Sequence, residues 1–111
     1  KLIYQIINET SMTLAYIICK DAVEAEKISL RLLKKRLIAC ANIFPIRSMY
    51  RWKGKIMNEA ENVIIAKTNE DNFNKVVNEV RKIHSYEIPC ILKIGSSANK
   101  DFEKWADKEM K

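Results

Sequence analysis

The chain has 111 residues, of which 48% are hydrophobic and 31% charged, with only two Gly and two Pro. This composition excludes a collagen-like or low-complexity chain and predicts one domain over residues 1–111, with a radius of gyration of roughly 13 Å. The net charge of +6 makes nucleic acid a candidate partner, which the sequence motifs must support or exclude. No apolar stretch approaches the roughly 18 residues that a membrane span needs.

The first half of the predicted fold begins with an N-terminal extension at residues 1–11, expected to be partly strand or frayed. The unbroken apolar run Leu14–Cys19 is typical of a strand that is covered on both faces. Asp21 then offers a helix N-cap with Glu24 three residues later, and the apolar spacing predicts an amphipathic helix that ends near Leu37.

A β-hairpin follows this helix. Its first arm runs from Cys40 to Tyr50, with Pro45 predicting a bulge or an unpaired edge at that point. The segment Trp52–Lys55 contains Gly54 and predicts a tight turn. The second arm is clearest at Val63–Ala66, where the residues are again apolar.

The remaining elements complete an α+β domain. Apolar residues at helical spacing from Phe73 to Val80 predict a second amphipathic helix, with Asn69 as a possible N-cap. A strand is predicted at Ile88–Ile94 and ends at Gly95, and a short C-terminal helix places Phe102, Trp105 and Ala106 on one face. The order strand–helix–strand–strand–helix–strand predicts a ferredoxin-like antiparallel sheet with helices on one face, plus the extra C-terminal helix.

The length of the hairpin predicts self-association. Twelve extended residues from Ala41 to Trp52 reach roughly 40 Å, which is more than the width of such a domain. The arms must therefore project, or a bulge at Pro45 must fold them back. Projecting arms would expose apolar side chains and unpaired strand edges, which favours a closed ring of copies. These side chains are Met49, Tyr50, Trp52, Ile56 and Met57.

Four sequence blocks carry a resemblance to a known family. They are Leu37-Ile38-Ala39-Cys40-Ala41-Asn42, Ser48-x-Tyr50-x-Trp52-x-Gly54-Lys55-Ile56, Glu61 with Lys67-Thr68, and His84-x-Tyr86-Glu87-Ile88-Pro89. In these blocks the sequence resembles the CutA family of divalent-cation tolerance proteins, without obvious gaps from about Met12 to Trp105. The resemblance implies a ferredoxin-like homotrimer joined through its long hairpin, a link to copper tolerance, and no established catalytic reaction.

Metal ligands follow from the same resemblance. Cys19 and His84 match family positions associated with copper, and Cys90 stands where the family often has an acidic residue, so it offers an extra thiolate. Thiolate and imidazole ligands suit copper or zinc. No metal is an obligatory cofactor on this view, and copper or another divalent ion is the expected partner. The structural alternatives are small core residues for Cys19 and Cys40, and a helix-dipole contact for His84.

A second group of matched positions combines aromatic rings with charge. Tyr50 and Trp52 are expected at the trimer interface. Glu61, Lys67, Tyr86 and Glu87 are expected to line a cleft between subunits that binds a small ligand. The alternative function is therefore a signalling or scaffold trimer similar to the nitrogen-regulatory PII proteins.

Two other classes of protein fit poorly. An RNA-recognition motif stacks bases on aromatic residues of its central strands, but the matching segment Glu61–Lys67 has no aromatic residue. No nucleic acid partner is therefore expected. An enzyme is not indicated either, because no group orients a Cys–His84 pair and the two Gly form no phosphate loop. The three Cys form no CxxC pair, which fits a reduced, cytoplasmic protein, and the start at Lys1 leaves room for an upstream targeting segment.

Overall fold

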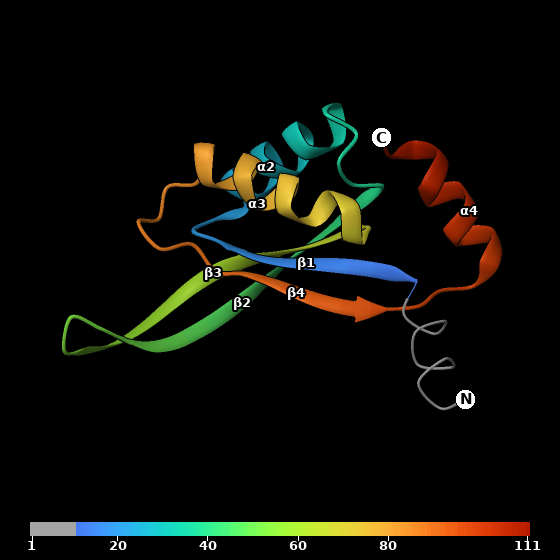
Figure 1. Cartoon of the computed structure of the whole chain (residues 1–111). Helices are drawn as coiled ribbons and strands as arrows, with labels where there is room; N and C mark the ends of the chain where they lie inside the picture. Colours follow the sequence, from blue (N-terminus) through green and yellow to red (C-terminus); the bar gives the residue numbers. More distant parts are fainter. Residues whose placement is uncertain (1–10) are drawn as a thin grey trace.

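The structure, a computed structural model, describes residues 11–111 and consists of one four-stranded antiparallel sheet with three helices (Figure 1). The sheet order is β2-β3-β1-β4. The strands are β1 (Met12–Cys19), β2 (Cys40–Trp52), β3 (Lys55–Thr68) and β4 (Ile91–Ser96). The helices are α2 (Ala22–Lys34), α3 (Glu70–Ile83) and α4 (Lys100–Glu109). This topology confirms the ferredoxin-like prediction, while nearly all of the predicted extension at 1–11 lies outside the described residues.

The hydrophobic core lies between one face of the sheet and helices α2 and α3, which cover that face side by side (Figure 1). Alternate residues of β1 point into it, and the register pairs Ala15 with Ala66 and Ile17 with Ile64 on the same face. The helices contribute the apolar positions that the sequence pattern predicted. The buried members from helices are Ala25, Ile28, Leu32, Phe73, Val76 and Val80.

The end of α2 differs from the prediction. The helix stops at Lys34 rather than near Leu37, because Arg36 adopts a left-handed conformation at φ 59°. The Leu37 N–H then donates to Leu32 O at 3.0 Å and the Arg36 N–H to Leu33 O at 2.9 Å, which is the Schellman pattern of a helix C-terminus. This pattern usually has Gly at the left-handed position, and because Arg36 stands there instead, the helix end is not predicted from the sequence.

Arg36 also binds helix α4, which lies at the end of the sheet opposite the hairpin tip (Figure 1). Its guanidinium donates to Glu109 O at 3.0 Å and to Lys108 O at 2.9 Å, so it satisfies carbonyls at the helix C-terminus. Met110 and Ala106 complete a second small core with Met12 and Ala39. The uncommon backbone angle at Arg36 is therefore held in place by contacts with the C-terminal helix.

The β2–β3 hairpin is continuous. Every residue of β2 from Cys40 to Trp52 has a register partner in β3, and Pro45 lies opposite Asn62 without a bulge. Since β2 is an edge strand, the missing N–H of Pro45 does not interrupt the ladder, so of the two predicted outcomes the edge is confirmed. Lys53 and Gly54 close the turn with φ of 49° and 80°, as a tight two-residue hairpin turn requires.

The last strand starts and ends later than predicted. Instead of Ile88–Ile94, β4 spans Ile91–Ser96. Residues 84–90 form the connecting loop after α3, while Gly95 keeps the extended backbone and pairs with Thr13. The Gly that was expected to end the strand therefore lies inside it.

The face of the sheet away from α2 and α3 is apolar and has no layer over it within residues 11–111 (Figure 1). On this face the exposed fractions are 37% for Phe44, 50% for Leu92 and 41% for Ile94. The run Leu14–Cys19 had predicted cover on both faces, but its outward residues are only half-buried. Residues 11–111 of one chain therefore provide one of the two expected layers.

The hairpin projects past the helices, as the length argument predicted (Figure 1). The molecule measures 47 × 34 × 22 Å, and its radius of gyration is 15.2 Å rather than the roughly 13 Å expected for a compact domain. Met49 and Ile56 near the tip are 68% and 63% exposed. The larger radius follows from this projection.

The buried carboxylate of Glu79 generates a prediction about acid stability. It accepts a hydrogen bond from Arg31 Nε at 2.8 Å and lies 3.1 Å from Lys35 Nζ, and these bonds lower the pKa of Glu79 from 4.5 to about 2. Because the folded-state pKa is depressed, the ionised group stabilises the fold above pH 4.5, and this contribution is lost as the pH falls toward 2. Glu79→Gln should therefore lower the urea midpoint at pH 7, and the gap to wild type should close between pH 4.5 and 2.

Glu26→Gln, an exposed carboxylate on α2, is the matched control and should leave the midpoint nearly unchanged. A gap for Glu79→Gln that stays constant over the whole pH range would contradict the assigned ion pairs.

Candidate functional site

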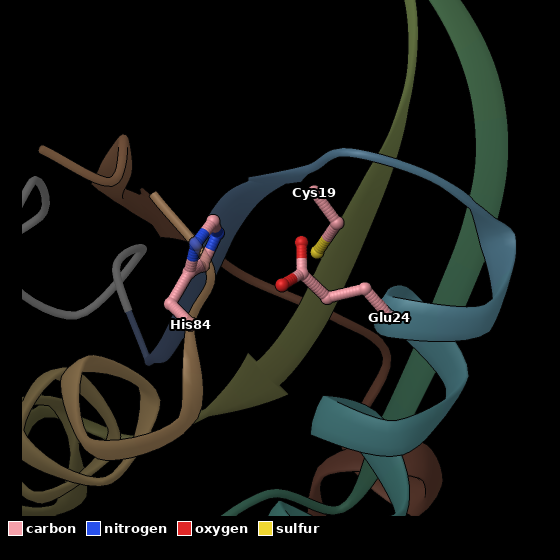
Figure 2. A group of neighbouring side chains, drawn as sticks. All are labelled: Cys19, Glu24 and His84. Carbon is pink, nitrogen blue, oxygen red and sulfur yellow. The ribbon is translucent and has the colours of Figure 1, made fainter. Parts of the chain in front are cut away.

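The first candidate site is a cluster of three side chains that could hold a metal ion. Cys19 comes from the end of β1, Glu24 from the first turn of α2, and His84 from the C-cap of α3. Their ligand atoms all lie within 4.8 Å of one another, and in Figure 2 the three side chains point toward a common centre. Sequence reasoning had paired Cys19 with His84, and the fold brings them together.

Both ring nitrogens of His84 already have hydrogen-bond partners. Nε2 lies 2.7 Å from the carbonyl oxygen of Ile18, and because a carbonyl only accepts, Nε2 carries the proton. Nδ1 accepts the backbone N–H of Tyr86 at 3.0 Å. The imidazole is thus held as the neutral Nε2–H tautomer. A metal ion that binds Nδ1 must displace the Tyr86 N–H.

Glu24 ties the start of α2 to the loop after α3. Its two carboxylate oxygens accept the backbone N–H groups of Lys20 at 3.0 Å and Ser85 at 2.9 Å. Burial opposes ionisation, but these hydrogen bonds outweigh it, so the pKa of Glu24 lies below its usual value. The Asp21 side chain caps the Glu24 N–H at 2.8 Å, as the sequence predicted. Glu24 is therefore an ionised, buried acceptor beside Cys19 and His84.

The Cys19 thiol is fully buried and protonated. Burial, together with the charges of Glu24 and Asp21, raises the pKa of Cys19 to about 12. Only a cation could offset those carboxylates and stabilise the thiolate. The cluster thus offers sulfur, nitrogen and oxygen donors of the kinds that copper and zinc prefer, but coordination would cost a proton and at least one hydrogen bond.

Cys90 does not belong to this cluster. It lies in the loop before β4 and lines a groove on the open face of the sheet, where burial and the charge of Glu61 raise its pKa. The substitution that was expected to add a thiolate to the metal site therefore lies in a different environment. Cys40 is also outside the cluster, with Lys67 Nζ 3.4 Å from its sulfur.

The groove is the second candidate site. It has a volume of ≈ 740 Å³ and lies between the hairpin and the loop that follows α3. Tyr50 donates a hydrogen bond to Glu59, and Tyr86 donates one to Glu61. Its lining residues come from β1, the hairpin and the loop: Ile18, Ser48, Met49, Tyr50, Trp52, Met57, Glu59, Glu61, Ser85, Tyr86, Glu87, Ile88 and Cys90.

The groove is acidic although the chain as a whole is basic. Glu61 is only 4% exposed, and no Lys or Arg within residues 11–111 forms an ion pair with it. The hydrogen bond to Glu59 raises the pKa of Tyr50 to about 12, and burial with the hydrogen bond to Glu61 raises the pKa of Tyr86 further. Both phenols therefore remain neutral hydrogen-bond donors to these carboxyl groups.

Of the four predicted cleft residues, three line the groove and one does not. Glu61, Tyr86 and Glu87 are present, together with the predicted interface residues Tyr50 and Trp52. Lys67 lies at the other end of β3, where its Nζ donates to Asn42 Oδ1 at 2.7 Å and sits 5.5 Å from the Phe102 ring.

Sequence reasoning missed Glu24 and Glu59 as site residues. Glu24 was interpreted only as a helix-capping residue, and nothing local distinguishes capping from a role beside Cys19. Glu59 could have been found from the hairpin register, because it shares a strand face with Glu61 two residues later.

Comparison with known proteins identifies the family to which this chain belongs. The family model described as "CutA1 divalent ion tolerance protein" matches residues 13–109. The chain belongs to the CutA1 family. A relative from Archaeoglobus fulgidus, the "Divalent-cation tolerance protein CutA", is 45% identical over 93 residues, which cover 83% of this chain and 91% of that protein. Another from Pyrococcus horikoshii with the same name is 39% identical over 101 residues, 90% of this chain and 99% of the relative.

Solved structures of the CutA1 family agree with the fold. The structure of the "Periplasmic divalent cation tolerance protein CutA" from Archaeoglobus fulgidus superposes with a TM-score of 0.88 at 42% identity, covering 90% of this chain and 99% of that one. The resemblance inferred from the four sequence blocks is thus confirmed. None of the helices in residues 11–111 combines the length and apolar character needed to cross a membrane.

The geometry predicts the relative reactivity of two of the cysteines, Cys19 and Cys40. At pH 8, a pKa of about 12 leaves only about one Cys19 thiol in ten thousand as thiolate, and its side chain is inaccessible. Iodoacetamide should therefore modify Cys19 more slowly than the partly exposed Cys40 by at least about tenfold. Peptide mass spectrometry over a time course measures both rates in one sample. Equal rates at the two positions would contradict the described burial of Cys19.

Proposed function

We propose that this CutA1-family chain is a homotrimeric protein of divalent-cation tolerance that binds copper or another divalent metal ion. The names of its relatives support the tolerance role. The cluster of Cys19, Glu24 and His84, with ligand atoms within 4.8 Å of one another, is the observation that carries the metal assignment. Cys19 would supply a thiolate, His84 an imidazole nitrogen and Glu24 a carboxylate oxygen.

The proposed role is binding rather than catalysis. A catalytic cysteine needs a lowered pKa and an adjacent base, whereas the Cys19 thiol is buried and protonated next to carboxylates. His84 Nδ1 accepts a backbone N–H and is not directed at the sulfur as a base. An exchangeable metal ion would replace the thiol proton, which makes binding dependent on pH and on the softness of the ion.

The homotrimer is supported by the uncovered sheet face and the projecting hairpin. The apolar residues of that face, among them Phe44, Leu92 and Ile94, need a second layer that residues 11–111 do not supply. Trp52 and Tyr50 lie on the hairpin arms that extend past the helices (Figure 1). Copies arranged as a closed ring would cover both features without leaving a free strand edge.

A second candidate function is a small-ligand trimer similar to the PII proteins. The observation that favours it is the groove of ≈ 740 Å³, a volume within the range of small-molecule sites. Its aromatic rings and buried carboxylate lie on the sheet face opposite the metal cluster. The two functions are compatible, since they use different side chains.

Metal titration tests the main proposal. We expect Cys19→Ser and His84→Ala each to weaken copper or zinc binding by about tenfold or more in calorimetry, because each removes a ligand. Cys40→Ser is the matched control, as this cysteine lies outside the cluster, and its affinity should equal that of wild type. Unchanged affinity in both cluster variants would place the metal elsewhere, and no binding of Cu(I), Cu(II) or Zn²⁺ by wild type would remove the metal function.

Oligomer mass tests the assembly. Trp52→Asp puts a charge on the hairpin arm, so trimer formation should weaken by at least about 2 kcal/mol and ultracentrifugation at micromolar concentration should detect smaller species. Val23→Asp is the control, because Val23 is equally apolar, 73% exposed and located on α2 away from the hairpin. Full trimer mass for Trp52→Asp would show that Trp52 is not part of the interface.

A further inference from the structure

We propose that Tyr86 is a positioning residue for the metal cluster: it opposes metal binding and transmits that binding to the opposite face of the sheet. The inference rests on the proposed metal function and adds how that site is regulated. Two hydrogen bonds carry it. The backbone N–H of Tyr86 is bonded to the imidazole of His84, and its hydroxyl is bonded to Glu61 on β3.

The bond between the Tyr86 N–H and His84 is incompatible with a metal ion on either ring nitrogen. The neutral imidazole carries its proton on Nε2, and Nδ1 accepts the Tyr86 N–H at 3.0 Å. An ion on Nδ1 takes the lone pair that this N–H uses. With an ion on Nε2, the neutral ring carries its proton on Nδ1, and two N–H groups then face each other. Ligation by His84 therefore breaks this hydrogen bond in both cases.

The hydroxyl of Tyr86 holds the residue in the position that makes this bond. It donates to Glu61 Oε2, and Glu61 is only 4% exposed. The Tyr86 ring also contacts the His84 ring, with the two centroids 4.9 Å apart. The backbone bond, the hydroxyl bond and the ring contact together fix Tyr86 between the cluster and the hairpin, so it cannot release His84 without straining its bond to Glu61.

The cluster also holds the residues next to Tyr86. The Ser85 N–H donates to Glu24 Oε2 at 2.9 Å, so a second candidate ligand anchors the same loop. His84 Nε2 in turn donates to the Ile18 carbonyl of β1 at 2.7 Å. A metal ion that binds His84 and Glu24 thus competes with the hydrogen bonds that order the loop after α3, and metal binding and loop order become linked.

This linkage has a direction that simple damage to the fold does not share. The affinity for metal is reduced by the fraction of molecules in which His84 is held by Tyr86, so weakening that hold raises the affinity. By reciprocity, a bound ion weakens the bond between the Tyr86 hydroxyl and Glu61 to the same extent. Tyr86 lies on the face that the proposed trimer covers with another copy, so that contact between copies differs with and without a bound ion.

Zinc titration of Tyr86→Phe, with Tyr50→Phe as the matched control, tests the inference by calorimetry on the full chain. Tyr86→Phe keeps the ring and the N–H and removes only the hydroxyl bond to Glu61, so it should bind zinc at least threefold more tightly than wild type. Tyr50→Phe removes the equivalent bond to Glu59 in the same groove but has no contact with His84. Its zinc affinity should stay within twofold of wild type.

Amide hydrogen exchange measured by NMR gives a second readout, on the wild-type chain. The Tyr86 N–H should exchange slowly without zinc because it is bonded to His84 Nδ1, and saturating zinc should speed its exchange at least fivefold. Ile64, which pairs with Ile17 and Ile43 in the centre of the sheet, is the internal control, and its rate should not change.

The possible failures are distinguishable. Zinc affinity of Tyr86→Phe equal to or weaker than that of wild type would overturn the role of Tyr86 and leave the metal function standing. An unchanged Tyr86 exchange rate in zinc-bound wild type would do the same, and it decides the question even where Tyr86→Phe does not fold. Absence of both zinc and copper binding by wild type would reject the metal function and this inference together.

Discussion

The unbroken pairing of β2 with β3 is the constraint on which the rest of the molecule depends. Its register runs from Cys40 opposite Lys67 to Trp52 opposite Lys55, and no bulge interrupts it. Because side chains alternate strictly along a strand, this register aligns Tyr50 and Trp52 with Glu59 and Glu61 on one face. A slip of one residue would turn these groups to the other face, and both the groove and the apolar sheet surface would be lost.

The two candidate sites lie on opposite faces of the sheet but share the short loop after α3. His84 faces the cluster, and Tyr86 links the two sites, since its N–H donates to His84 Nδ1 at 3.0 Å while its hydroxyl donates to Glu61. The two rings also contact each other, with centroids 4.9 Å apart. The loop after α3 therefore positions both the imidazole of His84 at the cluster and the carboxylate of Glu61 in the groove.

Local patterns were sufficient to predict the element order, and long-range contacts explain what they missed. The apolar spacing in α2 and α3, the Asp21 and Asn69 caps and the Gly54 turn all act within a few residues, so the sequence displays them directly. The end of α2 depends instead on Arg36, whose left-handed backbone is held by carbonyls some seventy residues away.

The same distinction applies to the candidate sites. Cys19 and His84 were paired only through the family resemblance, because they are 65 positions apart and share no spacing motif. Lys67 was assigned to the cleft from its matched position, yet it lies at the far end of β3, beside Phe102. Without the strand register, the sequence does not show which face of the sheet a side chain points to, nor where along the sheet the residue lies.

The tight Lys53–Gly54 turn also affects the order in which the chain folds. Each residue pair of the hairpin closes only a short loop once the pair nearer the turn has formed, so little chain entropy is lost at each step. Hairpins of this kind form in about 1–10 μs, whereas the pairing of β1 with β3 and β4 joins distant segments and is slower. The β2–β3 hairpin, which projects from the finished fold, is therefore expected to be one of the first elements to form during synthesis. Its unpaired strand edge is then exposed before the helices pack onto the sheet.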